Sequence, residues 1–70
     1  MMQQGFNFDA TEVLVVVRYR TRNHYLVNIG LPTDTWIPAQ HVFKLNWVDK
    51  RKRTAELTMP NWYVTDEGLK

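Results

Sequence analysis

Cysteine is absent from this sequence of 70 residues, so the protein forms no disulfide and offers no thiolate to a metal or a substrate. The same absence fits a reducing compartment. No apolar run approaches the ~18 residues that a membrane-spanning helix needs. The first residues also lack the basic segment followed by an apolar one that marks a secretory signal. We therefore expect a cytoplasmic protein with no membrane partner.

Groups that carry catalysis or bind metals are also sparse. The only histidines are His24 and His41, and the seven carboxylates are scattered along the chain without a recognisable nucleophile motif. A metal site usually needs three or four donors. The three glycines, Gly5, Gly30 and Gly68, are isolated, so there is no glycine-rich phosphate loop. We expect a protein that is not an enzyme and that holds neither a metal nor a cofactor.

Hydrophobic residues, by contrast, make up 44% of the chain, and nine residues are aromatic: three Trp, three Tyr and three Phe. This composition argues for a packed core and against disorder. A chain of this length has room for one domain, and it buries only about 60% of its unfolded surface. We expect a flexible N-terminal arm over residues 1–9, in which Phe6 and Phe8 alternate, and a single domain over residues 10–70.

Alternating and β-branched segments predict a mainly β fold. Strands are expected at residues 12–21, 24–29, 35–37, 42–47 and 54–59. A tight helical turn is expected at residues 39–41, because Pro38 ends the strand before it. The last segment loses the period of two and predicts a short helix that stops near Gly68. The resulting fold class is a small five-stranded antiparallel barrel or strongly bent sheet, SH3-like or OB-like in kind, with a short C-terminal helix.

Strand registers follow from keeping apolar residues on one face. A two-residue loop after the first strand would place Tyr25 opposite Arg20, so we prefer a three-residue loop that pairs Tyr19 with Val27. The same loop pairs Val17 with Ile29. The turn at residues 49–53 is predicted to pair Trp47 with Ala55, Leu45 with Leu57, and Phe43 with Met59.

The predicted core combines the inward positions of these strands with one helical residue. The segment around Leu14 and Val16 is apolar on both faces, so we expect the C-terminal helix to cover its second face. The predicted core residues are Val13, Val15, Val17, Tyr19, Val27, Ile29, Ile37, Phe43, Leu45, Trp47, Leu57 and Trp62.

Two short motifs are shared with known sequences. Trp36-Ile37-Pro38 is followed some twenty residues later by Pro60-x-Trp62-Tyr63 and by Gly68-Leu69. This spacing resembles a group of small, uncharacterised proteins of phages and mobile elements, in which a Trp-Ile-Pro-x-Ser-Gln step precedes a closing Pro-x-Trp-Leu and Gly-Leu. The chain departs from that pattern at Gln40-His41 and at Tyr63. The resemblance implies a phage or mobile-element setting, hence the host cytoplasm, and it implies no site residues.

The charges favour two kinds of partner. Net charge is +2, but the basic residues gather in the middle of the chain. A basic strand face and a basic turn suit DNA or RNA, with exposed aromatic rings available for stacking. The same charges also have a structural explanation: turns are solvated, and charged residues on the outer face of a strand discourage edge-to-edge association. The candidate contact residues are Arg18, Arg20, Arg22, Tyr25, Trp36, Lys44, Lys50, Arg51, Lys52 and Arg53.

A protein partner is the preferred interpretation. Nine aromatic residues are more than a core of this size easily hides, and Trp, Tyr and Arg dominate the energetics of protein interfaces. We expect a module that binds a host protein or protein complex, in the manner of a phage inhibitor, with nucleic acid as the alternative. A homodimer through a sheet edge is a further possibility. Trp36 has no clear cross-strand mate and is the position where we expect the contact.

Overall fold

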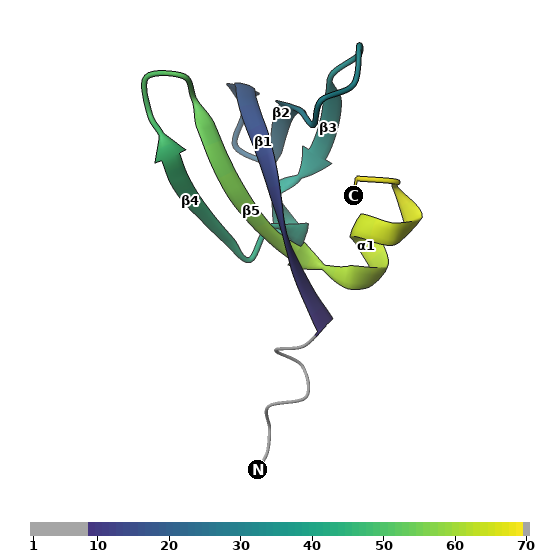
Figure 1. Ribbon diagram of the computed structural model, residues 1–70. Helices are drawn as coiled ribbons and strands as arrows, with labels where there is room; N and C mark the ends of the chain where they lie inside the picture. Colours follow the sequence, from purple (N-terminus) through teal and green to yellow (C-terminus); the bar gives the residue numbers. More distant parts are fainter. Residues whose placement is uncertain (1–8, 70) are drawn as a thin grey trace.

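The computed structural model describes residues 9–69, and it contains five strands and one short α-helix (Figure 1). The expected arm, with Phe6 and Phe8, therefore lies outside the described residues except for Asp9. Every predicted element is present. In chain order the elements are β1 (Ala10–Arg20), β2 (His24–Asn28), β3 (Thr35–Pro38), the 3-10 turn η2 (Ala39–His41), β4 (Lys44–Asp49), β5 (Thr54–Pro60) and α1 (Asn61–Asp66).

All strands join one antiparallel sheet in the order β3-β2-β1-β5-β4. The long strand β1 lies in the centre and pairs with β5 along its first half and with β2 along its second half. Figure 1 shows that the sheet is curved, so that β2 and β3 lie behind β1. Strands β3 and β4 are its two edges, so the sheet is open. The mainly β class is confirmed, and closure into a barrel is not.

The register between β1 and β2 differs from the prediction. Arg20 pairs with Tyr25, which is the register of the two-residue loop Arg22-Asn23 that we expected to be excluded. The register then shifts at Arg18, so that Val17 pairs with Val27. Such a β-bulge adds one residue to one strand and reverses the faces beyond it. The bulge reconciles the short loop with a buried Val17–Val27 pair, and it turns Tyr19 outward.

The turn between β4 and β5 follows the prediction more closely. Leu45 pairs with Leu57 and Trp47 with Ala55, as expected. A second bulge between Trp47 and Asp49 then brings Asp49 opposite Thr54. Backbone groups of the turn are satisfied by the Asp49 carboxylate, which accepts hydrogen bonds from the N–H groups of Arg51 (3.0 Å) and Lys52 (3.2 Å).

The core lies on the inner, concave face of the sheet. Six of the twelve predicted core residues are buried, and Ile29, Leu45 and Trp47 pack against the core while partly exposed. Three predicted core residues are wrong: Tyr19, Phe43 and Trp62 are 59%, 64% and 57% exposed. The buried residues are Val13, Val15, Val17, Val27, Ile37, Ala55, Leu57, Met59, Tyr63, Val64 and Leu69.

Helix α1 covers the inner face instead of the second face of β1. Tyr63 and Val64 of the helix join the core, while Leu14 on the opposite face is 59% exposed. The expectation that the helix covers Leu14 is therefore wrong, because the chain turns inward after Pro60. The helix ends at Asp66, two residues before Gly68, whose φ of 65° is left-handed. Leu69 then folds back, and its N–H donates to the Val64 carbonyl (2.9 Å). Within residues 9–69, no helix has the length and apolar character to cross a membrane.

Candidate functional site

An exposed aromatic group lies on the outer face of the sheet, where β1, β2 and β3 run side by side. Trp36 of β3 is 50% exposed and meets Tyr19 edge to face, with ring centroids 6.5 Å apart. His24 meets the same indole at 6.1 Å, again nearly perpendicular. Leu26 pairs with both Tyr19 and Trp36, so its side chain lies between them. We call these four residues, Tyr19, His24, Leu26 and Trp36, the outer patch.

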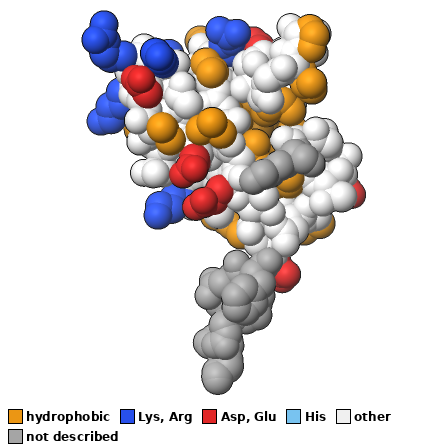
Figure 2. Space-filling model, viewed as in Figure 1, with side chains coloured by type: hydrophobic (Ala, Val, Ile, Leu, Met, Phe, Trp, Pro, Cys, Tyr) orange, Lys and Arg blue, Asp and Glu red, His pale blue; other side chains and the backbone are white. Residues whose placement is uncertain are grey.

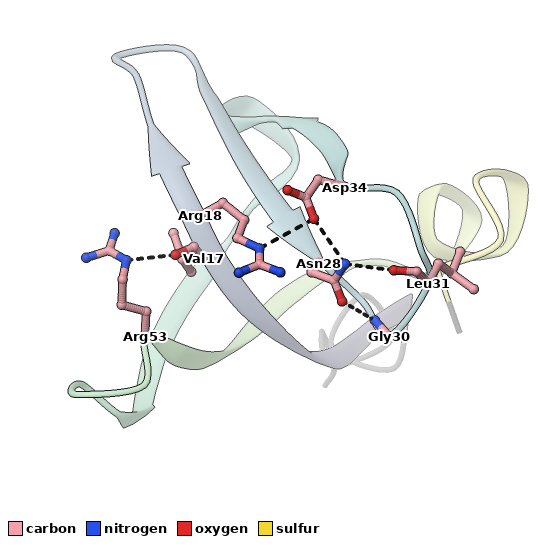
Figure 3. A network of polar contacts seen from close by, with 7 residues as sticks. All are labelled: Val17, Arg18, Asn28, Gly30, Leu31, Asp34 and Arg53. Carbon is pink, nitrogen blue, oxygen red and sulfur yellow. Dashed lines mark hydrogen bonds and ion pairs between the residues drawn. The ribbon is translucent and has the colours of Figure 1, made fainter.

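The loop beside the outer patch is held by a polar network (Figure 3). The Asn28 amide nitrogen donates to the Asp34 carboxylate (3.0 Å) and to the Leu31 carbonyl (2.8 Å), and the Asn28 oxygen accepts from the N–H of Gly30 (2.8 Å). Arg18 reaches the same carboxylate oxygen of Asp34 at 3.5 Å. This network anchors residues 30–34 to β2 and so fixes the start of β3, which carries Trp36.

A hollow of about 320 Å³ adjoins the outer patch at the end of the β1–β2 hairpin. It is bounded by the hairpin and by the exit of β3, which are joined by a hydrogen bond from the Ala39 N–H to the Asn23 carbonyl (2.7 Å). Its lining contains hydrogen-bonding side chains, and His24 belongs both to the hollow and to the outer patch. The lining residues are Asn23, His24, Pro38, Ala39 and Gln40.

The predicted strand arginines do not share one face. Arg18 is engaged with Asp34. Arg20 lies over the ring of Tyr25, 5.3 Å from its centroid, and Tyr25 packs against the core on the inner side. The expectation that these two arginines form one outer face is therefore wrong, because the bulge at Arg18 reverses the faces after it. Arg22, in the exposed hairpin loop, makes no ion pair or ring contact within residues 9–69.

The basic turn, residues 50–53, divides into two parts. Lys50, Arg51 and Lys52 are exposed and form no ion pair with any residue that the structure describes. Arg53 instead joins the fold: its Nε donates to the Val17 carbonyl (2.7 Å), and its guanidinium lies 5.8 Å from the centre of the Trp47 ring. The Val17 N–H in turn donates to the Arg53 carbonyl (2.8 Å). The basic turn is thus fastened beside the middle of β1.

Charge is divided between the two ends of the molecule. The hairpin and the basic turn hold seven of the candidate cations, since Val17 and Arg53 bring these segments together. Most of the Lys and Arg side chains visible in Figure 2 lie at its upper end, over the β4–β5 turn, and most Asp and Glu lie lower. Lys44 is separate from the other cations, on the edge strand β4 opposite Thr58. The acids toward the other end lie at or beside the start of β1 and the end of α1: Asp9, Glu12, Asp66 and Glu67.

A second aromatic group lies at the start of α1. His41 stacks on Tyr63 at 4.5 Å and meets the exposed ring of Trp62 at 5.3 Å. Burial raises the pKa of the Tyr63 hydroxyl above its ordinary value of 10.0, and the negative charge of Glu67 adds to the rise. Tyr63 is buried, so this group mainly fixes η2 against the helix.

The free edge of β3 exposes few backbone donors. Ala39 N–H bonds to the Asn23 carbonyl, and the register pairs Tyr25 with Ile37, so the backbone groups of Ile37 face β2. Those of Trp36 and Pro38 consequently face outward, and proline has no N–H. Edge β4 carries Lys44 and the bulge at Val48, features that discourage pairing. Dimerisation through an edge stays a prediction.

Three members of the outer patch were missed by sequence reasoning. The sequence predicts Tyr19 in the core and gives no contact role to His24 or Leu26. The two-residue loop would have pointed to this group. Its register pairs Arg20 with Tyr25 and so places Tyr19 opposite Leu26. Among the residues that the structure describes, no three His, Asp or Glu side chains are grouped to hold a metal ion. No protein-family model, curated protein or solved structure matches this chain.

Proposed function

We propose that this protein is a non-enzymatic protein-binding module and that the outer patch is its contact surface. The observation that carries this proposal is the pair Trp36 and Tyr19, which are about half exposed yet in ring contact across β2, the strand with which both β1 and β3 pair. Trp and Tyr are the residue types that most often dominate interface energetics. Rings that are already fixed lose little conformational freedom on binding, so more of their contact free energy appears as affinity.

The biological role that suits such a surface is occlusion of a host macromolecule. A rigid domain of this size covers a partner's surface without any chemistry of its own. The resemblance to small phage and mobile-element proteins in the Trp36-Ile37-Pro38 step supports that setting.

A matched pair of tryptophan variants tests the proposal. Immobilised protein is exposed to nuclease-treated lysate of the organism that encodes it, and retained proteins are quantified by mass spectrometry. We expect a protein that is retained by the wild type and by Trp62→Ala but lost from Trp36→Ala. Trp62 is the control because it is similarly exposed, at 57%, and lies on α1. Equal retention by both variants, or no specific retention, would contradict the proposal.

Nucleic-acid binding is the second candidate, and the basic turn favours it. Lys50, Arg51 and Lys52 are exposed and form no ion pair within residues 9–69. Binding of a 20-nucleotide single strand and of a 20-base-pair duplex is measured from 50 to 300 mM salt. Phosphate contacts predict an affinity that falls steeply with salt and is lost in the triple variant with glutamine at these positions. No binding at 50 mM salt would eliminate this candidate.

A further inference from the structure

We infer that the partner of the outer patch is an acidic polypeptide segment that places an apolar side chain against Trp36 and a carboxylate near Arg22. This inference rests on the proposed protein-binding function and specifies the chemistry of the ligand. It follows from the charge around the patch, the arrangement of the rings and the backbone of the neighbouring edge.

Charge complementarity points to an acidic ligand. Over residues 17–38, which hold β2, β3 and the adjoining half of β1, the cations are Arg18, Arg20 and Arg22, and the one acid is Asp34. Arg20 lies over the Tyr25 ring on the inner side. Asp34 is already engaged by Arg18 and Asn28. Arg22 is exposed in the loop that borders the hollow and has no ion pair within residues 9–69. An acidic residue of the ligand therefore gains a charge contact there without displacing an existing one.

The ring geometry favours a polypeptide over a nucleic acid. Trp36 meets Tyr19 at 87° and His24 at 89°, so the three rings form no parallel shelf on which successive bases stack. Two of the three arginines are also occupied, Arg18 by Asp34 and Arg20 by the Tyr25 ring. Perpendicular rings with half-buried Leu26 between them form an uneven apolar surface that suits a single aliphatic or aromatic side chain.

The ligand is expected to bind through side chains, because β3 is a poor template for an added strand. Only Trp36 offers an outward N–H along β3, and Pro38 offers none. The adjoining hollow of about 320 Å³ instead provides space for one further side chain beside His24. Its amide-bearing residues, Asn23 and Gln40, suit a carboxylate or amide group of the ligand.

Selection from a random peptide library tests the chemistry without knowledge of the natural partner. Displayed dodecapeptides are selected on the wild-type protein and counter-selected on Trp36→Ala. We expect a consensus with net negative charge and one large apolar residue. A neutral or basic consensus, or no enrichment over the counter-selection, overturns the inference.

Two matched pairs of variants then locate the contact of the selected peptide by calorimetry. Trp36→Ala is expected to weaken binding at least about tenfold, and Trp62→Ala less than about twofold. Arg22→Gln is expected to weaken binding about threefold at 50 mM salt and to converge with the wild type at 500 mM, whereas Lys52→Gln has little effect. Equal losses within either pair overturn the assignment, as does displacement of the peptide by a 20-nucleotide strand at equal concentration.

These outcomes separate the inference from the function on which it rests. A lysate protein that depends on Trp36 but contacts the patch through a neutral or basic segment, mapped by cross-linking, would leave the protein-binding function standing and refute the acidic ligand. If no lysate protein were retained in a Trp36-dependent way but the library still gave an acidic consensus, the protein-binding function alone would be refuted.

Discussion

Arg53 illustrates how a residue of the basic turn can act inside the fold rather than at its surface. Its φ of 56° lies in the left-handed region, which costs a residue with a Cβ about 1 kcal/mol. In return, its side chain donates to the carbonyl of Val17, a residue with no exposed surface, and lies over Trp47. Substitution by alanine and by glycine separates these two effects, because only glycine relieves the backbone.

The magnitudes follow from the contacts. A hydrogen bond from a charged donor contributes about 1.5–3 kcal/mol, and the lower end applies because Arg53 is exposed. The ring contact adds about 0.5 kcal/mol. Arg53→Ala loses both and keeps the unfavourable φ, so we expect it to lower the free energy of unfolding by about 2 kcal/mol. Arg53→Gly loses both but regains about 1 kcal/mol, which leaves a loss of about 1 kcal/mol.

Urea unfolding followed by circular dichroism measures both variants, with Lys52→Ala as the control in the same turn. The exposed Lys52 side chain forms no hydrogen bond or ion pair with the described residues, so its variant should stay within about 0.5 kcal/mol of the wild type. The slope with urea should be unchanged, which shows that stability alone differs. If Arg53→Ala matched the control, or if glycine cost as much as alanine, the structural role assigned to Arg53 would be refuted.

Three further predictions concern the core and the C-terminal segment. Ile37→Ala should lower the free energy of unfolding by about 3 kcal/mol because Ile37 has no exposed surface, while Leu31→Ala, 53% exposed, should change it little in the same urea assay. Gly68→Ala should cost about 1 kcal/mol, since φ is 65° and a Cβ there meets no atom within 4 Å. The raised pKa of Tyr63 means that the stability due to its neutral form is present below about pH 10 and is lost as pH rises through the folded-state pKa. Between pH 9 and 11, the melting temperature of Tyr63→Phe should therefore fall less steeply with pH than that of the wild type.

Much of the fold follows from local patterns. The elements were predicted because apolar residues alternate within strands, Pro38 ends β3, and Gly68 ends the last helical turn. The pairs Leu45–Leu57 and Trp47–Ala55 were also predictable, since this register keeps the apolar residues of both strands on the same face. Local patterning therefore indicates the strands, the two hairpins and most of the core, whereas the pairings of β1 with β5 and of β2 with β3 were not predicted.

What escaped prediction depends on contacts between distant segments. Trp62 and Tyr63 are neighbours on the short helix α1, and which of them is buried depends on the direction in which the chain leaves Pro60. Leu14 lies in a continuous apolar run, and the run does not reveal that one of its faces remains open. Trp36 was recognised as a candidate contact because it lacked a mate, but its neighbours Tyr19 and His24 depend on the register.

The bulge at Arg18 links the fold to the candidate site. A regular strand would keep Tyr19 on the same inner face as Val17, and burying that ring would stabilise the core by about 1.5–3 kcal/mol. The observed strand instead exposes Tyr19 beside Trp36 and turns Arg20 inward over Tyr25. Bulges are frequent beside functional sites, and natural proteins break local rules where function requires it. The bulge therefore leaves the Tyr19 ring exposed, in contact with Trp36 on the surface that we propose binds a partner.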